Sequence, residues 1–340
     1  MRLTTEERLQ YIYAIKTARS DPRYSKKFYD LGYFHTVNFC KELHCKVSLL
    51  PWHRWFILQY ENLLREIVPN ITLVYWDWSM VMANPFNIDL WDDNDWSFGG
   101  NGDGVNNTVI TGPFKEPEWK MVPGVGRFSN LQFKRKFNYT YPGLPSALHL
   151  AILLKLKPNE AQEFLDVLLG WHNNFHSKAF GFVSTMSDEY AVWAPEFFLH
   201  HAFLDKCWTD WQEQGYDYQF LPFFTDQTRH MYGTHYLPID FVDTKYQQGN
   251  VCVTYERSKQ EWIHKLLRNL TIDQLRDIRG LTFPPFESEQ VRKLLTNHST
   301  YVDVIAEFNR KYKLRNPITL DELDGTDRER GFRIHDLIEM

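Results

Sequence analysis

One group of histidines is spaced to chelate a metal ion. His172 and His176 stand at positions i and i+4 of a segment predicted to be helical, so both imidazoles leave the same face one turn apart. The next predicted helix carries His200 and His201, and can supply a third ligand. Adjacent helix residues point about 100° apart, so we expect only one of them to bind. Asp205, one turn beyond His201, is placed to hold that ring in a metal-binding tautomer, which favours His201 and leaves His200 a packing or supporting role.

A second group lies nearer the N-terminus. His35, His44 and His53 recur at nine-residue intervals, which is not the spacing of a single helix face. The pattern indicates a helix, a loop and a second helix that converge on one point. Three neutral imidazoles in each group, with no thiolate or carboxylate added, suit copper, or else zinc or iron.

The elements that must position these histidines are mainly helical. Helices are predicted at 3–19, with an N-cap at Thr4 or Thr5, and at 51–68, 158–178 and 195–214. The stretch VCVTYE at 251–256 has the composition of a strand, and amphipathic helix is predicted beyond 257. The fold class is therefore mainly α, a four-helix bundle around a dinuclear site, with long irregular loops and little β-structure.

Residues 79–145 are rich in Gly, Asn, Asp and Pro, and are predicted to be a long irregular region. A loop of that length inside a compact domain is usually functional or disordered. Its large aromatic side chains favour an ordered loop. They are Trp91, Trp96, Phe98 and Trp119.

The composition excludes several classes of protein. The 340 residues are 43% hydrophobic, enough for a sizeable core, and carry a formal charge of −5. Acidic and basic residues are interleaved without a basic block, so no nucleic-acid partner is expected. No apolar run approaches the roughly 20 residues that a membrane-spanning helix needs.

Other features favour a secreted protein. The chain opens MRLTTEERLQ, which is not a secretory leader; this is only weak evidence for a cytosolic protein, because a mature secreted chain has lost its leader. Two features point to secretion instead. Four cysteines allow two disulfides, in three pairings, or buried free thiols: Cys40, Cys45, Cys207 and Cys252. Five Asn-x-Ser/Thr sequons predict N-glycans, at Asn70, Asn106, Asn138, Asn269 and Asn297.

At these motifs the sequence resembles the type 3 dicopper proteins, specifically secreted animal tyrosinases, with catechol oxidases and molluscan haemocyanins as relatives. HCKVSLLPWHRWFILQYE (44–61) is similar to the first copper signature, with His44 and His53 as ligands. APEFFLHHAFLD (194–205) is similar to the second, in which the second histidine, here His201, binds. The segments VYWDWS, HNNFH and FGGNGDGVNNTVITGPF also match.

The resemblance covers roughly residues 5–255, and the chain departs from the pattern at several positions. Leu49 stands where Phe is usual, and Ala194 replaces a usual Asp, which puts the cap of that helix in doubt. Glu42 occupies the place of the cysteine that forms a thioether to a ligand histidine in the molluscan pattern. A short disulfide between Cys40 and Cys45 is therefore expected instead of the thioether.

The resemblance implies two copper ions, O2 as cosubstrate and small phenols as substrates. Residues 1–255 would form the dicopper catalytic core and 256–340 a helical extension packed on it. Glu163 and Asn173 would hold a water that deprotonates monophenols, unless Glu163 is an ordinary solvated carboxylate. Phe197 would stack near the substrate, unless it only packs in the core.

The expected function is oxidation of monophenols and o-diphenols to o-quinones. The alternatives are a catechol oxidase without monophenolase activity, a haemocyanin-like O2 carrier, and a zinc-loaded or inactive relative. Carriers of this family cover the site with a C-terminal β-sandwich, whereas the tail of this chain is predicted to be helical. The sequence therefore favours the enzyme, without naming its natural phenol or its role in pigment, shell, cuticle or defence.

Overall fold

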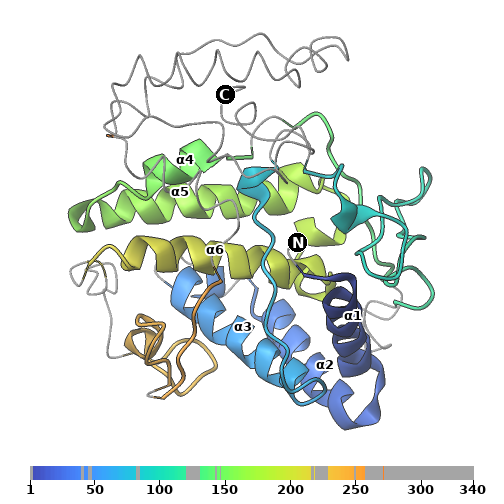
Figure 1. Ribbon diagram of the computed structural model, residues 1–340, viewed down its shortest axis with the longest axis horizontal. Helices are drawn as coiled ribbons and strands as arrows, with labels where there is room; N and C mark the ends of the chain where they lie inside the picture. Colours follow the sequence, from blue (N-terminus) through green and yellow to red (C-terminus); the bar gives the residue numbers. More distant parts are fainter. Residues whose placement is uncertain are drawn as a thin grey trace. The chain divides into compact units, whose positions relative to one another are not determined.

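In a computed structural model, the chain is described for residues 3–39, 42–44, 48–81, 85–119, 131–141, 144–145, 147–215, 218, 229–248, 250–256 and 271. It divides into two compact units. The first unit comprises residues 1–78, 84–144 and 156–258, and contains every predicted site residue. The second comprises 79–83, 145–155 and 259–340, and its described part includes helix α4, Ala147–Leu153. Figure 1 shows the helices by label.

The first unit opens with two helices. Helix α1, Thr5–Ser20, begins at the predicted cap, because Thr4 and Glu7 form a reciprocal capping box. Helix α2, Pro22–Val37, follows after a single residue: the Asp21 side chain accepts from the Arg23 amide and Pro22 fills the first turn. Helix α2 is the helix expected to carry His35 into the first histidine group.

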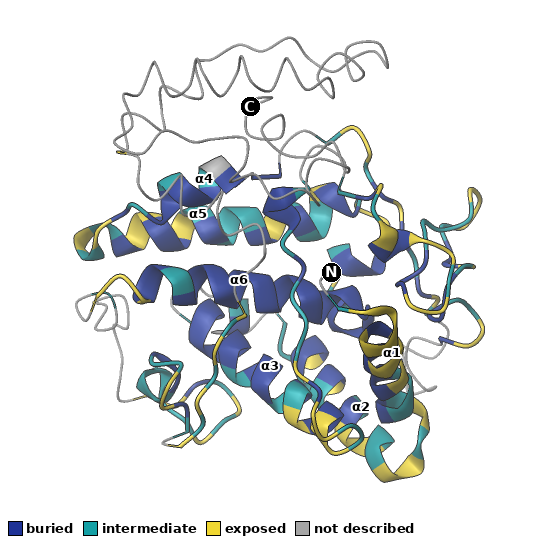
Figure 2. Ribbon diagram, in the orientation of Figure 1, coloured by how far each residue is buried: buried dark blue, intermediate teal, exposed yellow. Residues whose placement is uncertain are grey.

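Two long helices form the centre of the unit. Helix α3, Leu49–Arg65, begins and ends slightly earlier than predicted. Helix α6, Glu196–Gln212, is buried along almost its whole length, as the dark ribbon in Figure 2 shows. A helix that is buried on all sides lies in the interior of a domain. Helix α6 has no side-chain N-cap, in keeping with the missing Asp at Ala194.

The helices pair in antiparallel fashion. On α2 and α3, Phe28 contacts Tyr60 at a ring-centroid distance of 6.5 Å, and His35 contacts His53 at 5.7 Å. The start of one helix thus lies beside the end of the other. On α3 and α6, Tyr60 stacks on Phe198 at 3.5 Å. These aromatic contacts fix the register between the three helices.

Helix α5, Ala161–Asn174, completes the bundle. Phe164 at its start stacks on Trp211 at the end of α6 (4.4 Å), while His172 near its end lies beside His201 at the start of α6 (5.1 Å). The predicted segment 158–178 therefore exists, but it is not one uniform helix. A 3₁₀ turn, Pro158–Glu160, precedes α5 and a π-helical turn, Phe175–Ala179, follows it.

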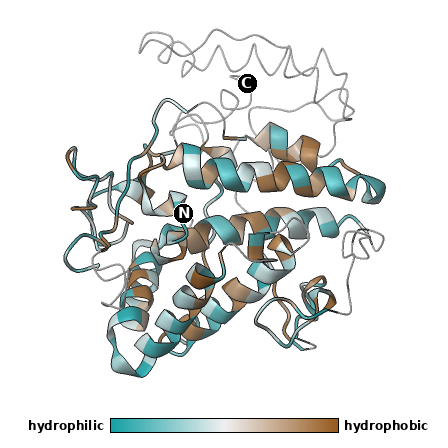
Figure 3. Cartoon of the chain, turned by 180° about the vertical axis from the view of Figure 1, so that it is seen from behind, coloured by the Kyte–Doolittle hydropathy of each residue, from teal (hydrophilic) through white to brown (hydrophobic). Residues whose placement is uncertain are grey.

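The irregular region is ordered where the structure describes it, at 85–119 and 131–141. Phe98, Trp91 and Trp119 are at most 5% exposed, whereas Trp96 is 38% exposed. Arg135 anchors the region to the first turn of α6 through a bidentate ion pair with Glu196, at 2.8 Å for both nitrogens. Figure 3 shows hydrophobic and hydrophilic residues mixed along the segments that surround the bundle.

The predicted strand at 251–256 is wrong. Within the described residues only isolated bridges occur, and Val251 pairs with Gln247 alone. The alternation VCVTYE lacks a neighbouring strand to pair with, so it stays extended without a ladder. The predicted helices of the tail lie outside the described residues, and no described helix has the length and hydropathy of a membrane span.

The Arg135–Glu196 pair generates a prediction about stability. Both side chains are fully buried, so Arg135→Met should leave an unpaired buried carboxylate and lower the free energy of unfolding by about 3–5 kcal/mol. Urea unfolding followed by circular dichroism measures the loss. The double variant Arg135→Met/Glu196→Gln should recover part of it. A single variant as stable as the parent would contradict the prediction.

Candidate dinuclear metal centre

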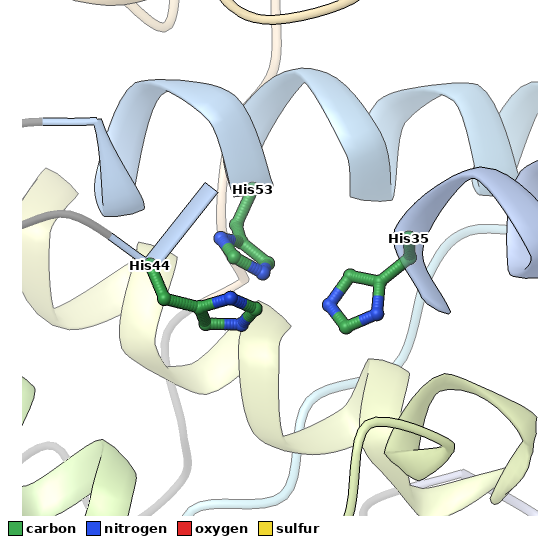
Figure 4. A group of neighbouring side chains, drawn as sticks. All are labelled: His35, His44 and His53. Atoms are coloured by element: carbon green, nitrogen blue, oxygen red, sulfur yellow. The ribbon is translucent and has the colours of Figure 1, made fainter. Parts of the chain in front are cut away.

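The first histidine group forms as predicted from the nine-residue intervals. His35 comes from α2, His44 from a 3₁₀ turn (Glu42–His44) and His53 from α3, and one ring nitrogen of each lies within 4.8 Å of the others. Figure 4 shows the three rings directed toward one another between these elements. A helix, a short turn and a second helix therefore converge on one point.

The position of His35 depends on a close helix contact. Trp193 packs against Gly32 of α2, where an added Cβ would lie 2.7 Å from the indole ring. The Trp193 indole N–H donates to Thr36 Oγ1, one residue beyond His35. Glycine at position 32 is thus required by the close approach, and the indole fixes the end of α2 that carries the ligand.

The second group takes its rings from α5, the π turn and α6. His172 and His176 lie 4.5 Å apart between ring centroids. Both adjacent histidines of α6 come within reach of them: a ring nitrogen of His200 lies within 4.8 Å of theirs, and His201 Nε2 lies 3.4 Å from His176 Nε2. π-helical turns are rare and are frequent at functional sites, as at His176 here.

The two groups form one centre. His53 of the first group stacks on His201 of the second at 4.2 Å between centroids, with their planes 9° apart. His44 lies 5.8 Å from His172. Rings from both groups therefore face a common interior, as a dinuclear site requires.

Four of the rings have their tautomer set by an oxygen acceptor. Nδ1–H of His53 donates to the Leu49 carbonyl at 2.8 Å, and Nδ1–H of His44 to the Phe39 carbonyl at 3.0 Å. A carbonyl oxygen only accepts, so the proton must sit on Nδ1 and the Nε2 lone pair is left for a metal.

The second group uses the same arrangement. Nδ1–H of His172 donates to Asn173 Oδ1 at 2.9 Å, and Nδ1–H of His176 to the Met186 carbonyl at 2.6 Å. Asn173 thus orients a predicted ligand directly. The sequence gives no signal for the carbonyls of Leu49 and Met186, because every residue carries one.

Burial keeps the histidines neutral. Desolvation is the largest cause lowering the pKa of all six predicted ligands, and neighbouring rings add to it for five of them. The pKa of His176 falls to about 4. Neutral imidazoles are the form that binds metals, so the centre is ready to take them near pH 7.

The centre fits a pair of metal ions. Nε2 of His53 and of His172, and both ring nitrogens of His35, are buried without a hydrogen-bond partner. A buried polar atom without a partner costs about 1–3 kcal/mol, so such a cluster is explained by ligands that bind the lone pairs. An all-imidazole donor set is suited to copper, zinc or iron.

The proposed reason for choosing His201 is wrong. Asp205 does not orient the His201 ring, because both of its carboxylate oxygens have other partners. Oδ1 accepts from Arg54 Nε at 2.6 Å and Oδ2 accepts from the Tyr255 hydroxyl at 2.5 Å. Arg54 is 1% exposed and follows His53 on α3. The carboxylate therefore clamps the two ligand-bearing helices together behind the metal centre, and does not orient a ring.

The structure does not bring Glu163 to the centre. Its side chain is exposed in the first turn of α5, and nine residues of helix separate it from His172 by about 13 Å. Phe197, in contrast, lies at the centre: it is 0% exposed, 4.1 Å from the His201 ring and 5.1 Å from the His35 ring.

Neither described cysteine forms a disulfide. Cys207 is a buried free thiol whose pKa burial raises well above its usual value, and Cys252 is an exposed free thiol. Two disulfides are therefore not formed. Cys40 and Cys45 lie outside the described residues, so their pairing stays a prediction.

Comparisons with known proteins agree with this centre. A family model described as the common central domain of tyrosinase matches residues 25–214. A tyrosinase of Streptomyces antibioticus is 27% identical over 234 residues, covering 65% of this chain and 84% of that protein. Hemocyanin 1 of Megathura crenulata is 30% identical over 178 residues, covering 50% of this chain and 5% of that protein.

A solved structure supports the fold. The structure of a polyphenol oxidase variant from Thermothelomyces thermophila superposes with a TM-score of 0.56 at 21% identity, covering 75% of this chain and 87% of that one. The mainly helical fold class is confirmed by this likeness and by the bundle itself.

Replacing Asn173 by Leu should weaken metal binding, because His172 loses the acceptor that holds its Nδ1 proton. Loss of such a partner typically costs 10–100-fold in metal affinity, about the effect expected here. Competition with a chelator measures the affinity for copper. Asn174→Leu, the same change one residue along, is the control and should bind as the parent does. Equal copper affinities in the two variants would contradict the role assigned to Asn173.

The free energy of unfolding of the metal-free protein should decrease as the pH is lowered. Because the histidine pKa values are depressed by folding, the stabilisation is complete above the unfolded pKa of about 6.5 and is lost as the pH falls toward the folded value, about 4 for His176. Each such histidine costs about 1.4 kcal/mol per pH unit in that window. Urea midpoints at about pH 7.5 and about pH 5 measure it. An unchanged midpoint would show that the rings are not buried neutral.

Proposed function

This chain belongs to the tyrosinase family of type 3 dicopper proteins, and from that premise we propose that it oxidises o-diphenols to o-quinones with O2. The family and the two histidine groups together establish a type 3 copper centre. Each turnover of O2 would convert two catechols into two quinones and two waters. One observation supports the proposal: the two histidine groups meet in one interior, where His53 of the first stacks on His201 of the second.

The copper pair supplies the redox and Lewis-acid chemistry when it is bound. The chain supplies geometry and exclusion of water. Carbonyl and amide oxygens hold the Nδ1 protons of four rings, so the Nε2 lone pairs stay oriented without reorganisation. Phe197 places a fully buried apolar ring against one histidine of each group, His35 and His201.

The approach of substrate is expected from the side of two half-buried ligands. His44 and His176 are only partly buried, whereas His35, His53 and His201 are at most 4% exposed. A phenol that enters on this side meets one ligand from each group. We therefore expect its oxygen to reach the centre there, with its ring against apolar side chains.

Hydroxylation of monophenols has less support from the structure than oxidation of o-diphenols. A monophenol must lose a proton before it is hydroxylated, and this step needs a base within hydrogen-bond reach. Glu163 is exposed about 13 Å along the helix from His172. The described contacts of the six rings are with carbonyl and amide oxygens, indoles and other rings. We propose o-diphenols as the preferred substrates for this reason.

An O2 carrier is the second candidate. It rests on the similarity to a haemocyanin, which covers half of this chain. A carrier would bind O2 at the same centre but exclude phenols from it. The two candidates therefore differ in turnover, not in metal content.

We also propose that the protein is secreted and glycosylated. The sequon residues Asn70 and Asn106 are exposed, as a glycan requires, whereas Asn138 is half-buried and accepts from the Thr140 hydroxyl. Asn269 and Asn297 lie outside the described residues.

Oxygen consumption by the copper-loaded protein tests the proposed activity. 4-tert-Butylcatechol should be turned over without a lag, and 4-methoxyphenol at least about 10-fold more slowly, because deprotonation lacks a positioned base. His53→Gln should abolish both reactions. His230→Gln, which changes an exposed histidine in the part of the chain that the structure describes, should leave them intact.

Three results would decide otherwise. Reversible O2 binding without catechol turnover would establish the carrier. Equal rates on both substrates would show that a base acts on monophenols after all. Neither O2 binding nor turnover at full copper occupancy would overturn the proposed oxidase.

A further inference from the structure

The ring of His200 is buried beside the second histidine group but has a different kind of partner from its neighbours. It is 0% exposed and stacks on Phe175 at 3.9 Å between centroids, with the planes 2° apart. The Trp78 indole N–H donates to its Nδ1 at 3.3 Å. His200 is thus fixed in position by a ring on one side and an indole at one nitrogen.

The polarity of that partner sets the tautomer. In His172 and His176 an oxygen acceptor requires the proton to be on Nδ1, which leaves Nε2 for a metal. An indole nitrogen can only donate, so in His200 it requires a lone pair on Nδ1 and places the proton on Nε2. A metal at Nε2 of His200 would force two N–H donors to face each other at Nδ1.

The Nε2–H of His200 is a buried donor that has no acceptor among the described residues. Nε2 is without a hydrogen-bond partner in the described structure. One ring nitrogen of His200 lies within 4.8 Å of ring nitrogens of His172 and His176. Because Nδ1 accepts from Trp78, we infer that Nε2 is the nitrogen left for this interior. A buried N–H that makes no hydrogen bond lowers the stability of the fold. An acceptor that binds together with the metals or the substrate would complete the hydrogen bond.

The geometry points to a distinct role for this pair: Trp78 holds His200 as the Nε2–H tautomer, so that His200 donates a hydrogen bond to an anionic oxygen bound at the second metal. His201 is then the third ligand of that metal. The substrate class that fits is a phenolate or another oxygen anion. This inference rests on the dinuclear centre proposed above, but not on its oxidase activity.

Two observations bear on the assignment of His201 as ligand. Its Nε2 lies 3.4 Å from His176 Nε2, as close as two nitrogens of one coordination sphere. Its ring also stacks on His53 of the first group. His201 therefore lies between the groups, while His200, held against Phe175, lies to one side in contact with the second group.

Redox-silent zinc separates ligation from hydrogen bonding. The full chain loaded with Zn(II) should hold two ions, and His200→Phe should still hold two, whereas His201→Phe should lose the second. Benzoate, titrated into the zinc protein by calorimetry, serves as the oxygen anion. His200→Phe loses a hydrogen bond to the charged benzoate, so its dissociation constant for benzoate should be about 10–100-fold larger.

Trp78→Phe tests the positioning role. It keeps an aromatic ring but removes the N–H, so benzoate affinity should also fall, by at least about threefold. In this background His200 is free to carry the proton on Nδ1, and the double variant Trp78→Phe/His201→Phe should regain part of the second zinc. Trp91→Phe removes another buried indole N–H, which donates to the Pro85 carbonyl, and should leave benzoate affinity unchanged.

Nitrogen-15 NMR of the unmutated zinc protein keeps the test decisive if a variant does not fold. His200 should show a protonated Nε2 and an unprotonated Nδ1. The opposite tautomer, or loss of one zinc in His200→Phe, would make His200 a ligand and overturn the inference. Unchanged benzoate affinity in His200→Phe would overturn the donor role. Failure of catechol turnover alone would affect only the proposed oxidase.

Discussion

The structure depends on keeping buried imidazoles neutral with their lone pairs directed inward. Desolvation lowers the pKa of each predicted ligand, and the unpaired nitrogens of His35, His53 and His172 would be costly without metal ions. The oxygen acceptors at Nδ1 decide which nitrogen faces the interior. Phe39, just past the end of α2, and Met186, in a 3₁₀ turn, each supply a carbonyl. Leu49 supplies one from the first turn of α3, and Asn173 supplies its side-chain oxygen.

The bundle is built around that requirement. Antiparallel pairing brings the end of α2 to the start of α3 and the end of α5 to the start of α6, so all ligands meet at one level. Behind them Arg54 bonds Asp205, the Thr209 hydroxyl and the carbonyls of Phe241 and Val242, and stacks over an indole. This buried cation ties α3 to α6 and to the segment that follows, so the distance between the groups is fixed by the core.

Spacing predicted that the histidines converge in two groups, because helical periodicity directly sets which side chains share a face. The choice of His201 over His200 stays a prediction, since the ring nitrogens that lie within 4.8 Å of one another in the second group are those of His172, His176 and His200. Partners far apart in sequence were not predictable in this way. Asp205 was expected to hold His201, but a competing cation 151 positions away, Arg54, binds it. Glu163 follows the family spacing, yet continuous helix carries it away from the centre. The Trp78 contact was also missed, although its segment VYWDWS matched the family pattern, since a motif does not show which atom donates to which.

Anomalous diffraction at the copper edge, on crystals of the copper-loaded chain, tests the central claim most directly. We expect two peaks, each about 2.0–2.1 Å from three Nε2 atoms, one set from His35, His44 and His53 and the other from His172, His176 and His201. A single peak, coordination through Nδ1, or a second ion bound to His200 in place of His201 would contradict it.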